Sequence, residues 1–201
     1  MPIIVTDIQQ GSPEWFQACC GNVGASNIDK IVTTKGERSK QRDDYMMTLC
    51  AERITGKREV GFTTQAMLNG IEREAEARTL FEMANNCEVQ QVGLIYKDEK
   101  KLCHCSPDGL IGDKEGFEVK NPLSKTHIKY LLNGSLPTEY FCQIQFSLYV
   151  SERDAWWFMS HYPGLKPFIL QINRDEKWIA KMESELNSFN EELAEMVEKI
   201  K

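Results

Sequence analysis

Helical periodicity is strongest at the end of the chain, where apolar residues recur every three or four positions from residue 174 to residue 200. Two earlier stretches share this pattern. Residues 41–55 end at Gly56, and residues 63–84 have Thr63 or Thr64 as a cap and end at Asn85 and Asn86. The spacing therefore predicts three long helices. The apolar positions of the last one are Trp178, Ile179, Met182, Leu186, Phe189, Leu193 and Val197.

The N-terminal part contains shorter signals. Residues 3–8 can form a strand or an extended arm, and Ser12 followed by Pro13 is typical of a helix start that leads to an end near Gly21. We expect Ser26 to cap a second short helix that runs through Val32. Residues 33–40 are polar and basic, which predicts a mobile loop.

In the middle of the chain the period changes from helix to strand. Residues 88–96, 101–105, 109–112 and 116–120 are short runs separated by turn residues, and they predict an antiparallel set of strands. Helices follow at 124–132 and 138–150, and strands follow at 154–161 and 167–173. Together these elements predict an α+β fold, with a mixed β-sheet flanked by helices. Without repeats or a linker, residues 1–201 are expected to form a single domain.

Composition narrows the class of protein. The chain has 201 residues, of which 41% are hydrophobic, and this is enough for one sizeable core. No apolar run approaches a membrane span, and the first residues lack the features of a secretory signal, so we expect no membrane association and a cytoplasmic location. The seven cysteines are odd in number and contain no CxxC. Cys103-His104-Cys105 is a weak metal-site candidate beside the simpler interpretation as core residues.

The net charge of −6 argues against a generally basic surface, but the charge is uneven. Between Lys30 and Arg58 there are eight Lys or Arg residues against four acids. We therefore consider Arg38, Lys40 and Arg42 as candidates for DNA contact. The alternative is an ordinary solvated face, and charge by itself favours that alternative.

The most informative segment contains Asp108, Glu118 and Lys120. Glu118 and Lys120 are two residues apart on a predicted strand, so their side chains leave the same face. Asp108 follows a Pro turn on the neighbouring strand, and pairing of the two strands would bring it to that face. Two carboxylates suit a hard cation such as Mg²⁺, and a lysine beside a metal-bound water suits phosphodiester hydrolysis.

This pattern is weak when taken alone, because a surface hairpin with an exposed Glu–Lys pair also fits it. Phe117 and Val119 alternate with the polar pair, which favours a functional hairpin with one apolar face. Glu74 and Arg78 lie one helical turn apart and fit a surface ion pair. Gln143 and Gln145 stand in an apolar segment, so each is either a structural hydrogen bonder or is directed at the site.

These residues resemble a known family, the phage lambda exonuclease or YqaJ-type branch of the PD-(D/E)xK nucleases. The matching pieces occur in one order along nearly the whole chain, namely WFQACCGNVGAS from Trp15, EAEARTLFE from Glu74, SPDGL from Ser106, FEVKNP from Phe117, QIQFSLYV from Gln143 and AWWF from Ala155. The resemblance implies a restriction-endonuclease-like core.

The resemblance also implies roles. Asp108, Glu118 and the main-chain carbonyl of Val119 would hold Mg²⁺, with two ions expected and Mn²⁺ as a possible substitute, and Lys120 would act on the water. Glu74 and Gln143 would assist as catalytic residues, and Ser26 and Ser106 would line a pocket for the terminal 5′-phosphate. The family degrades one strand of linear double-stranded DNA from the 5′ end and leaves a 3′ overhang. Its members include ring-shaped homotrimers that work with a single-strand annealing protein in phage or prophage recombination.

One residue departs from the family pattern where the terminal 5′-phosphate would bind. Cys19 stands where the family usually has an arginine, and a thiol cannot replace a bidentate cation. A preference for 5′-phosphorylated ends is therefore in question, and a residue of the 35–42 loop is a candidate substitute. Two other functions stay open, namely endonucleolytic cutting by the same site and a DNA-binding recombination scaffold that has lost catalysis.

Overall fold

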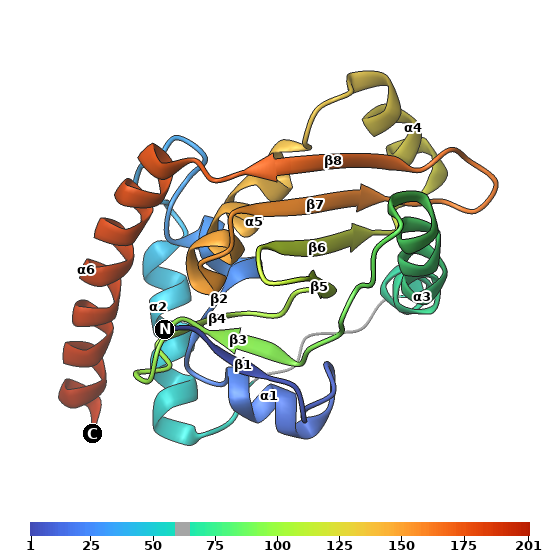
Figure 1. The fold of residues 1–201 in the computed structure, drawn as a ribbon. Coiled ribbons are helices and arrows are strands. Elements are labelled where there is room, and N and C mark those ends of the chain that lie inside the picture. Colours follow the sequence, from blue (N-terminus) through green and yellow to red (C-terminus); the bar gives the residue numbers. More distant parts are fainter. Residues whose placement is uncertain (59–64) are drawn as a thin grey trace.

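The computed structural model describes the backbone of residues 1–58 and 65–201, and the side chains of the same residues except 65–72. Within these residues there are two four-stranded sheets (Figure 1). The first has the order β1-β3-β4-β2, and the second has the order β5-β6-β7-β8. The strands are β1 (Ile3–Val5), β2 (Val23–Gly24), β3 (Leu94–Tyr96), β4 (Cys103–Cys105), β5 (Gly109–Ile111), β6 (Glu115–Lys120), β7 (Ala155–Ser160) and β8 (Phe168–Asn173).

The pairing of these strands differs from the predicted antiparallel set. The neighbours β3 and β4 are antiparallel, as are β5 and β6, but the two pairs belong to different sheets. An isolated bridge between Gln90, which precedes β3, and Leu110 of β5 connects the two pairs. Each sheet also contains one parallel pair, β2 with β4 and β6 with β7, which brings together strands that are distant in sequence. Both sheets are therefore mixed, as the α+β prediction requires.

The helices lie close to their predicted bounds. They are α1 (Pro13–Cys19), the 3₁₀ helix η1 (Ala25–Lys30), α2 (Arg42–Thr55), α3 (Gln65–Asn85), α4 (Ser124–Asn133), α5 (Thr138–Ser151) and α6 (Glu176–Ile200). Ser12 caps α1 as predicted, because its side chain accepts a hydrogen bond from the Trp15 amide. The caps proposed at Thr63 or Thr64 lie outside the described residues. The role expected of Ser26 is wrong, since Ser26 lies inside η1 and Gly24 occupies the cap position.

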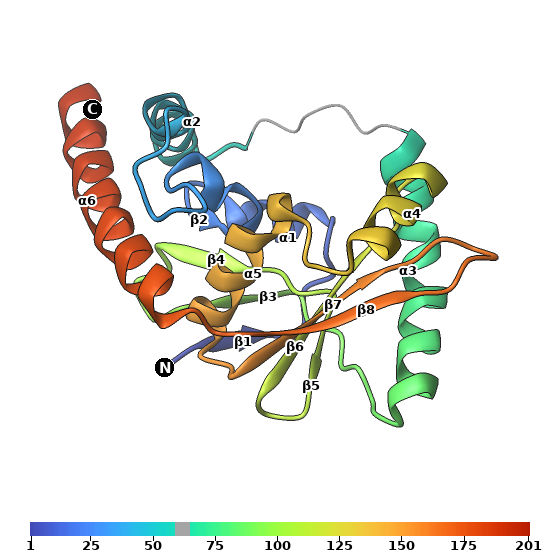
Figure 2. The same cartoon turned by 90° about the horizontal axis from the view of Figure 1, so that it is seen from above.

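The layers follow from the alternation along β6. Phe117 and Val119 pack against α3 through Ala77 and Phe81. The opposite face of the sheet carries Trp156 and Phe158 of β7 and packs against residues of α4 and α5. Figure 2 shows α3 and α4 at one end of the molecule and α6 beside α2 at the other, with α5 between them. The polar residues of β6 consequently face α5 rather than α3.

The helix α6 covers the largest core cluster. All seven of its predicted apolar residues are buried, and they pack with residues of α2, α5 and the first sheet. The same helix holds the 33–40 loop in place through ion pairs, whereas the sequence predicts a mobile loop there. Arg38 pairs with Glu185 at 3.1 Å, and Arg42 at the start of α2 pairs with Glu192 at 2.7 Å. Among the described residues, no helix is long and apolar enough to cross a membrane.

Candidate active site

The hairpin of β5 and β6 brings Asp108 to the face that carries Glu118 and Lys120. The Asp108 amide donates to the Phe117 carbonyl at 3.1 Å, which continues the ladder one residue beyond β5. The Asp108 carboxylate then accepts a hydrogen bond from the Val119 amide at 2.7 Å through Oδ2. Its second oxygen, Oδ1, is not used in this bond. The pairing inferred from the short turn is therefore present, and it fixes Asp108 against the middle of β6.

Glu118 is the centre of a hydrogen-bonded group. It is 3% exposed, and its Oε1 accepts from both Lys120 Nζ and Gln143 Nε2, the latter at 2.7 Å. The ammonium of Lys120 also lies 5.4 Å from the centre of the Tyr140 ring. Because α5 contributes both Gln143 and Tyr140, this helix positions the lysine and the glutamate together. Tyr140 was not among the residues predicted for the site, although it precedes Gln143 by three residues and therefore shares its helix face.

The two glutamines of α5 have different roles. Gln143 donates a hydrogen bond to Glu118, so of the two alternatives it is the one directed at the site. Gln145 is 1% exposed and is a structural hydrogen bonder, because it donates to the Asn173 carbonyl at 2.9 Å and accepts from the Asp175 amide at 2.8 Å. It therefore connects α5 to the end of β8 and the beginning of α6.

Negative charge is in excess at this site. Burial and the neighbouring Glu118 carboxylate raise the pKa of Asp108 well above its ordinary value, although Lys120 opposes them. Burial alone would lower the pKa of Lys120, but Glu118 and Asp108 raise it above its ordinary value. The lysine therefore stays an ammonium ion at neutral pH. One ammonium does not balance two carboxylates, so the site favours an additional cation.

Glu74 extends the acidic group from α3. Arg78 pairs with Glu74 at 3.3 Å, as an i,i+4 pair should, and it also donates to the main-chain carbonyl of Asp108 at 3.5 Å. Burial raises the pKa of Glu74 even though Arg78 lowers it. The pair is thus more than a surface ion pair, because it lies against the loop that carries Asp108.

The donor atoms fit a hard divalent cation. Across the residues with described side chains, no group of three or more His, Cys, Asp or Glu is placed to hold a metal ion. The N–H and C=O of one strand residue point to the same side. Since the Val119 amide faces Asp108, the Val119 carbonyl is on the same side of β6, past the first residue of β5. Two carboxylates and one carbonyl are oxygen ligands of the kind that Mg²⁺ uses together with water.

The weaker metal candidate, Cys103-His104-Cys105, lies in the core. All three residues are buried, and burial raises the pKa of Cys103 to about 12 and lowers that of His104 to about 4. The thiols are therefore protonated and the imidazole is neutral. These are properties of core side chains, as the simpler interpretation of this motif states.

Ser26 and Ser106 come to the same end of the first sheet. The parallel pairing of β2 with β4 aligns Gly24 with His104, and each serine lies two residues beyond its member of this aligned pair. Ser26 is exposed on η1, whereas Ser106 is partly buried and accepts a hydrogen bond from Trp15 Nε1 at 3.0 Å. The placement of both serines at one end of the sheet depends on a parallel pairing that the sequence pattern did not predict.

The expectation that Arg42 contacts DNA is wrong. Its side chain is 2% exposed, and two of its nitrogens bind the two carboxylate oxygens of Glu192 at 2.7 and 2.8 Å. Arg38 is 54% exposed, but it pairs with Glu185 and Glu192. Lys40 is exposed and keeps its position as a candidate. The acids that neutralise the arginines lie about 150 positions later in the chain, which is why the local charge balance was misleading.

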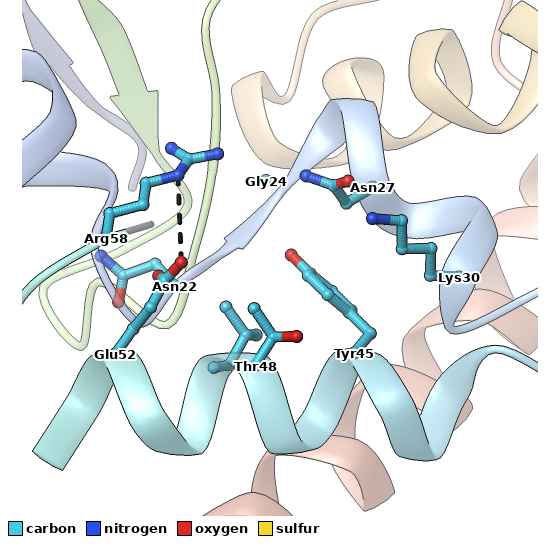
Figure 3. Close-up of a pocket in the computed structure, with 9 residues that line it drawn as sticks. Asn22, Gly24, Asn27, Lys30, Tyr45, Thr48, Glu52 and Arg58 are labelled. Atoms are coloured by element: carbon cyan, nitrogen blue, oxygen red, sulfur yellow. Dashed lines mark ion pairs between the residues drawn. The ribbon is translucent and has the colours of Figure 1, made fainter. Parts of the chain in front are cut away.

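A cavity of about 160 Å³ lies between α2, η1 and the end of β2 (Figure 3). Two cations, Lys30 and Arg58, line it together with one acid, Glu52. Its other lining residues are Asn22, Gly24, Asn27, Tyr45, Thr48 and Leu49. Lys30 and Arg58 are the two ends of the basic stretch in the sequence, and only the fold brings them to a common site.

Comparisons with known proteins show the family and the fold of this chain. A family model described as the YqaJ-like viral recombinase domain matches residues 14–154. The crystal structure of an alkaline exonuclease from Laribacter hongkongensis, LHK-Exo, matches with 33% identity and a TM-score of 0.85, covering 94% of this chain and 96% of that one. The match has the same values for LHK-Exo in complex with dAMP.

Two further matches are partial or more distant. A curated Escherichia coli K12 protein named ExoD is 33% identical over 78 residues, which is 36% of this chain and 82% of that protein. A phage-related exonuclease from Haemophilus somnus 129PT has 12% identity and a TM-score of 0.69, covering 90% of this chain and 96% of that one. This last likeness supports the fold alone.

Proposed function

Because the chain belongs to the YqaJ-like viral recombinase family, whose relatives are nucleases of recombination, we propose that it is a magnesium-dependent 5′→3′ exonuclease of linear double-stranded DNA. It would degrade one strand and leave a 3′ overhang. The observation that carries the proposal is the joint position of Asp108, Glu118 and Lys120, with two carboxylates that share one ammonium.

The proposal assigns a role to each residue of the site. Asp108 and Glu118, with the Val119 carbonyl, would hold two magnesium ions, for which manganese would be a substitute. When bound, the metal supplies a water of lowered pKa and neutralises charge on the scissile phosphate. Lys120, held by Glu118 and the Tyr140 ring, orients that water and stabilises negative charge as it develops. Gln143 fixes Glu118, and Glu74, paired with Arg78 on α3, would assist the metal and its water.

The substrate end is assigned to the first sheet. Ser26 and Ser106 are proposed to bind the 5′-phosphate, and the exposed Lys40 to contact the duplex. The dAMP complex of LHK-Exo is consistent with an exonuclease, because a nucleoside monophosphate is the product of removing a terminal nucleotide. By the same family resemblance, we propose a ring-shaped homotrimer that delivers its overhang to a single-strand annealing protein in the cytoplasm of a bacterial host.

Digestion of three DNA forms tests the proposal. Linear duplexes labelled at one 5′ or one 3′ end, and covalently closed circles, are incubated with Mg²⁺ or with EDTA. We expect early release of the 5′ label as mononucleotide, a retained 3′ label, intact circles and no reaction in EDTA. Nicked or linearised circles would assign the same site to an endonuclease. Binding without cleavage in Mg²⁺ or Mn²⁺ would favour the inactive scaffold.

A further inference from the structure

Arg58 lies against the position at which this chain lacks the family's arginine. Cys19 is 1% exposed, and burial raises its pKa to about 12 while the adjacent Arg58 guanidinium opposes the shift. Arg58 follows α2, which ends at Gly56 in a left-handed turn with φ of 65°. The backbone therefore reverses at Gly56 and carries the guanidinium from α2 back to α1.

Two contacts connect Arg58 to the catalytic loop. Its guanidinium lies over the Trp15 ring, 5.8 Å from the ring centre. The indole N–H of Trp15 donates to the hydroxyl of Ser106, which precedes Asp108 by two residues. A cation on the face of an aromatic ring is held in place without use of its N–H groups. Arg58 is thus positioned beside the loop by the Trp15 ring, and its guanidinium also hydrogen-bonds the Cys19 thiol.

The surroundings of Arg58 suit an anion. The cavity of about 160 Å³ is comparable to cavities that take up a benzene-sized ligand. Figure 3 shows Arg58 and Lys30 entering from opposite sides, with Asn27 and the Tyr45 hydroxyl between them. Asn22 and Thr48 add further polar groups to the lining. Two cations, one acid and several neutral hydrogen-bonding groups therefore surround the space.

The acid in the cavity does not fully satisfy Arg58. Glu52 accepts a hydrogen bond from the Gly21 amide at 2.7 Å through Oε2, and its Oε1 lies 4.0 Å from Arg58 Nε. This distance is a long ion pair rather than a bidentate one. The side chain of Arg58 is 26% exposed, so a ligand can reach it. Glu52 can hold the guanidinium in this direction before a ligand arrives.

Other arginines nearby are already engaged. Arg53 donates through Nε to the Gly21 carbonyl at 2.8 Å, and Arg42 is bidentate to Glu192. The 35–42 loop, which was the expected source of a substitute, directs its arginines to α6 instead. Arg58 is the arginine that lines the cavity and also contacts Trp15.

We infer that Arg58, with Lys30 across the cavity, binds the phosphomonoester at the 5′ end of the DNA strand, and so replaces the arginine that this chain lacks at Cys19. The inference rests on the proposed function for the identity of the ligand. A guanidinium can donate two parallel hydrogen bonds to two phosphate oxygens, and a phosphomonoester offers three. A 5′-hydroxyl end offers no such acceptor, so Arg58 makes this chain selective for phosphorylated ends.

Binding in the absence of catalysis tests this assignment. The affinity of short linear duplexes with 5′-phosphate or 5′-hydroxyl ends is measured in EDTA for the wild type, Arg58→Gln and Lys57→Ala. We expect the wild type to bind the phosphorylated end about tenfold more tightly or better, which is the strength of charge-assisted hydrogen bonds. Arg58→Gln should lose most of this preference, since only Lys30 and the serines then contact the phosphate, and Lys57→Ala, an exposed cation one residue away, should keep it.

The outcomes separate this inference from the proposed function. An Arg58→Gln protein that keeps the preference, or a wild type without any preference, would overturn the role of Arg58 even if the enzyme digests DNA. A wild type that discriminates the two ends but cleaves neither would leave the phosphate site in place and overturn the nuclease. Competition by inorganic phosphate, measured on the wild type alone, gives a second test: it should weaken binding of the phosphorylated duplex only, and equal weakening of both would contradict the assignment.

Discussion

In the hairpin of β5 and β6, two carboxylates share one ammonium, whereas in the loop before α2 the arginines meet carboxylates of α6. Both regions are rich in charge, and both contain residues that the sequence offered as functional candidates. The hairpin keeps an excess of negative charge that raises the pKa of Asp108, while the loop is neutralised within the fold. Buried charge that the fold leaves unbalanced indicates a ligand, and charge that the fold pairs indicates structure.

The largest expected effect is at Asp108. Asp108→Asn should lower the rate of DNA cleavage by about 10³-fold or more, because a charged ligand of the metal is lost. The amide oxygen can still accept from Val119, so the hairpin should persist. Urea unfolding in EDTA should show a free energy of unfolding that is higher than in the wild type, because the repulsion from Glu118 is gone. Asp113→Asn, in the exposed turn between β5 and β6, is the control. A clear loss of stability would show that Asp108 is structural.

The next effect is at Lys120. Lys120→Ala should reduce cleavage by about 10²–10³-fold, the effect of removing one group that stabilises developing charge. Affinity for duplex DNA, measured by anisotropy in Ca²⁺, should change little. Lys129→Ala, an exposed lysine on α4, should leave both quantities unchanged. Cleavage at the wild-type rate in Lys120→Ala would contradict the assignment.

In the basic region the expected effect is on stability. Glu192→Gln should lower the free energy of unfolding at neutral pH by about 1–3 kcal/mol, because Arg42 is buried and loses its charged partner. Cleavage by the folded protein should be unchanged. If cleavage is reduced while the free energy of unfolding is unchanged, this loop would instead be part of the DNA-binding surface.

The pH dependence of this loss has a definite sign. The hydrogen bond from Arg42 is the main cause that lowers the pKa of Glu192 from 4.5 to about 2. Since the pKa is lower in the folded state, the stabilisation is complete above about pH 4.5 and is lost as the pH falls toward about 2. Urea unfolding at pH 7, 5, 4 and 3 should therefore show the difference between Glu192→Gln and the wild type shrink below pH 4.5. A difference that is constant with pH would contradict the ion pair.

The smallest expected effect is at Lys40. Lys40→Ala should weaken duplex binding modestly and reduce the slope of log K against log salt by about 0.9, the contribution of one phosphate contact. Arg38→Ala should change the slope less, because this arginine is paired with α6 acids. Equal slopes for the wild type, Lys40→Ala and Arg38→Ala would show that the loop does not contact DNA.

The parts that the sequence predicted have local causes. Ser12 and Pro13 start α1, Gly56 ends α2, and the seven apolar residues of α6 all face the core. The turn between β5 and β6 is short, so the proximity of Asp108 to Glu118 followed from spacing and alternation alone. Each of these features depends on residues within about one or two turns of each other, where backbone geometry leaves few alternatives.

The other parts were decided by contacts between distant segments. Parallel pairing of β2 with β4 and of β6 with β7 needs crossovers whose partners no local pattern specifies. Whether an arginine is neutralised by Glu192 or directed at a cavity also depends on which helix packs beside it. The sequence by itself therefore determined the helices and the hairpin that carries the candidate active site. The tertiary structure decided the division into two sheets, the pairing of Arg42 with α6, and the position of Arg58 beside Cys19, because long-range packing sets the surroundings of a charge.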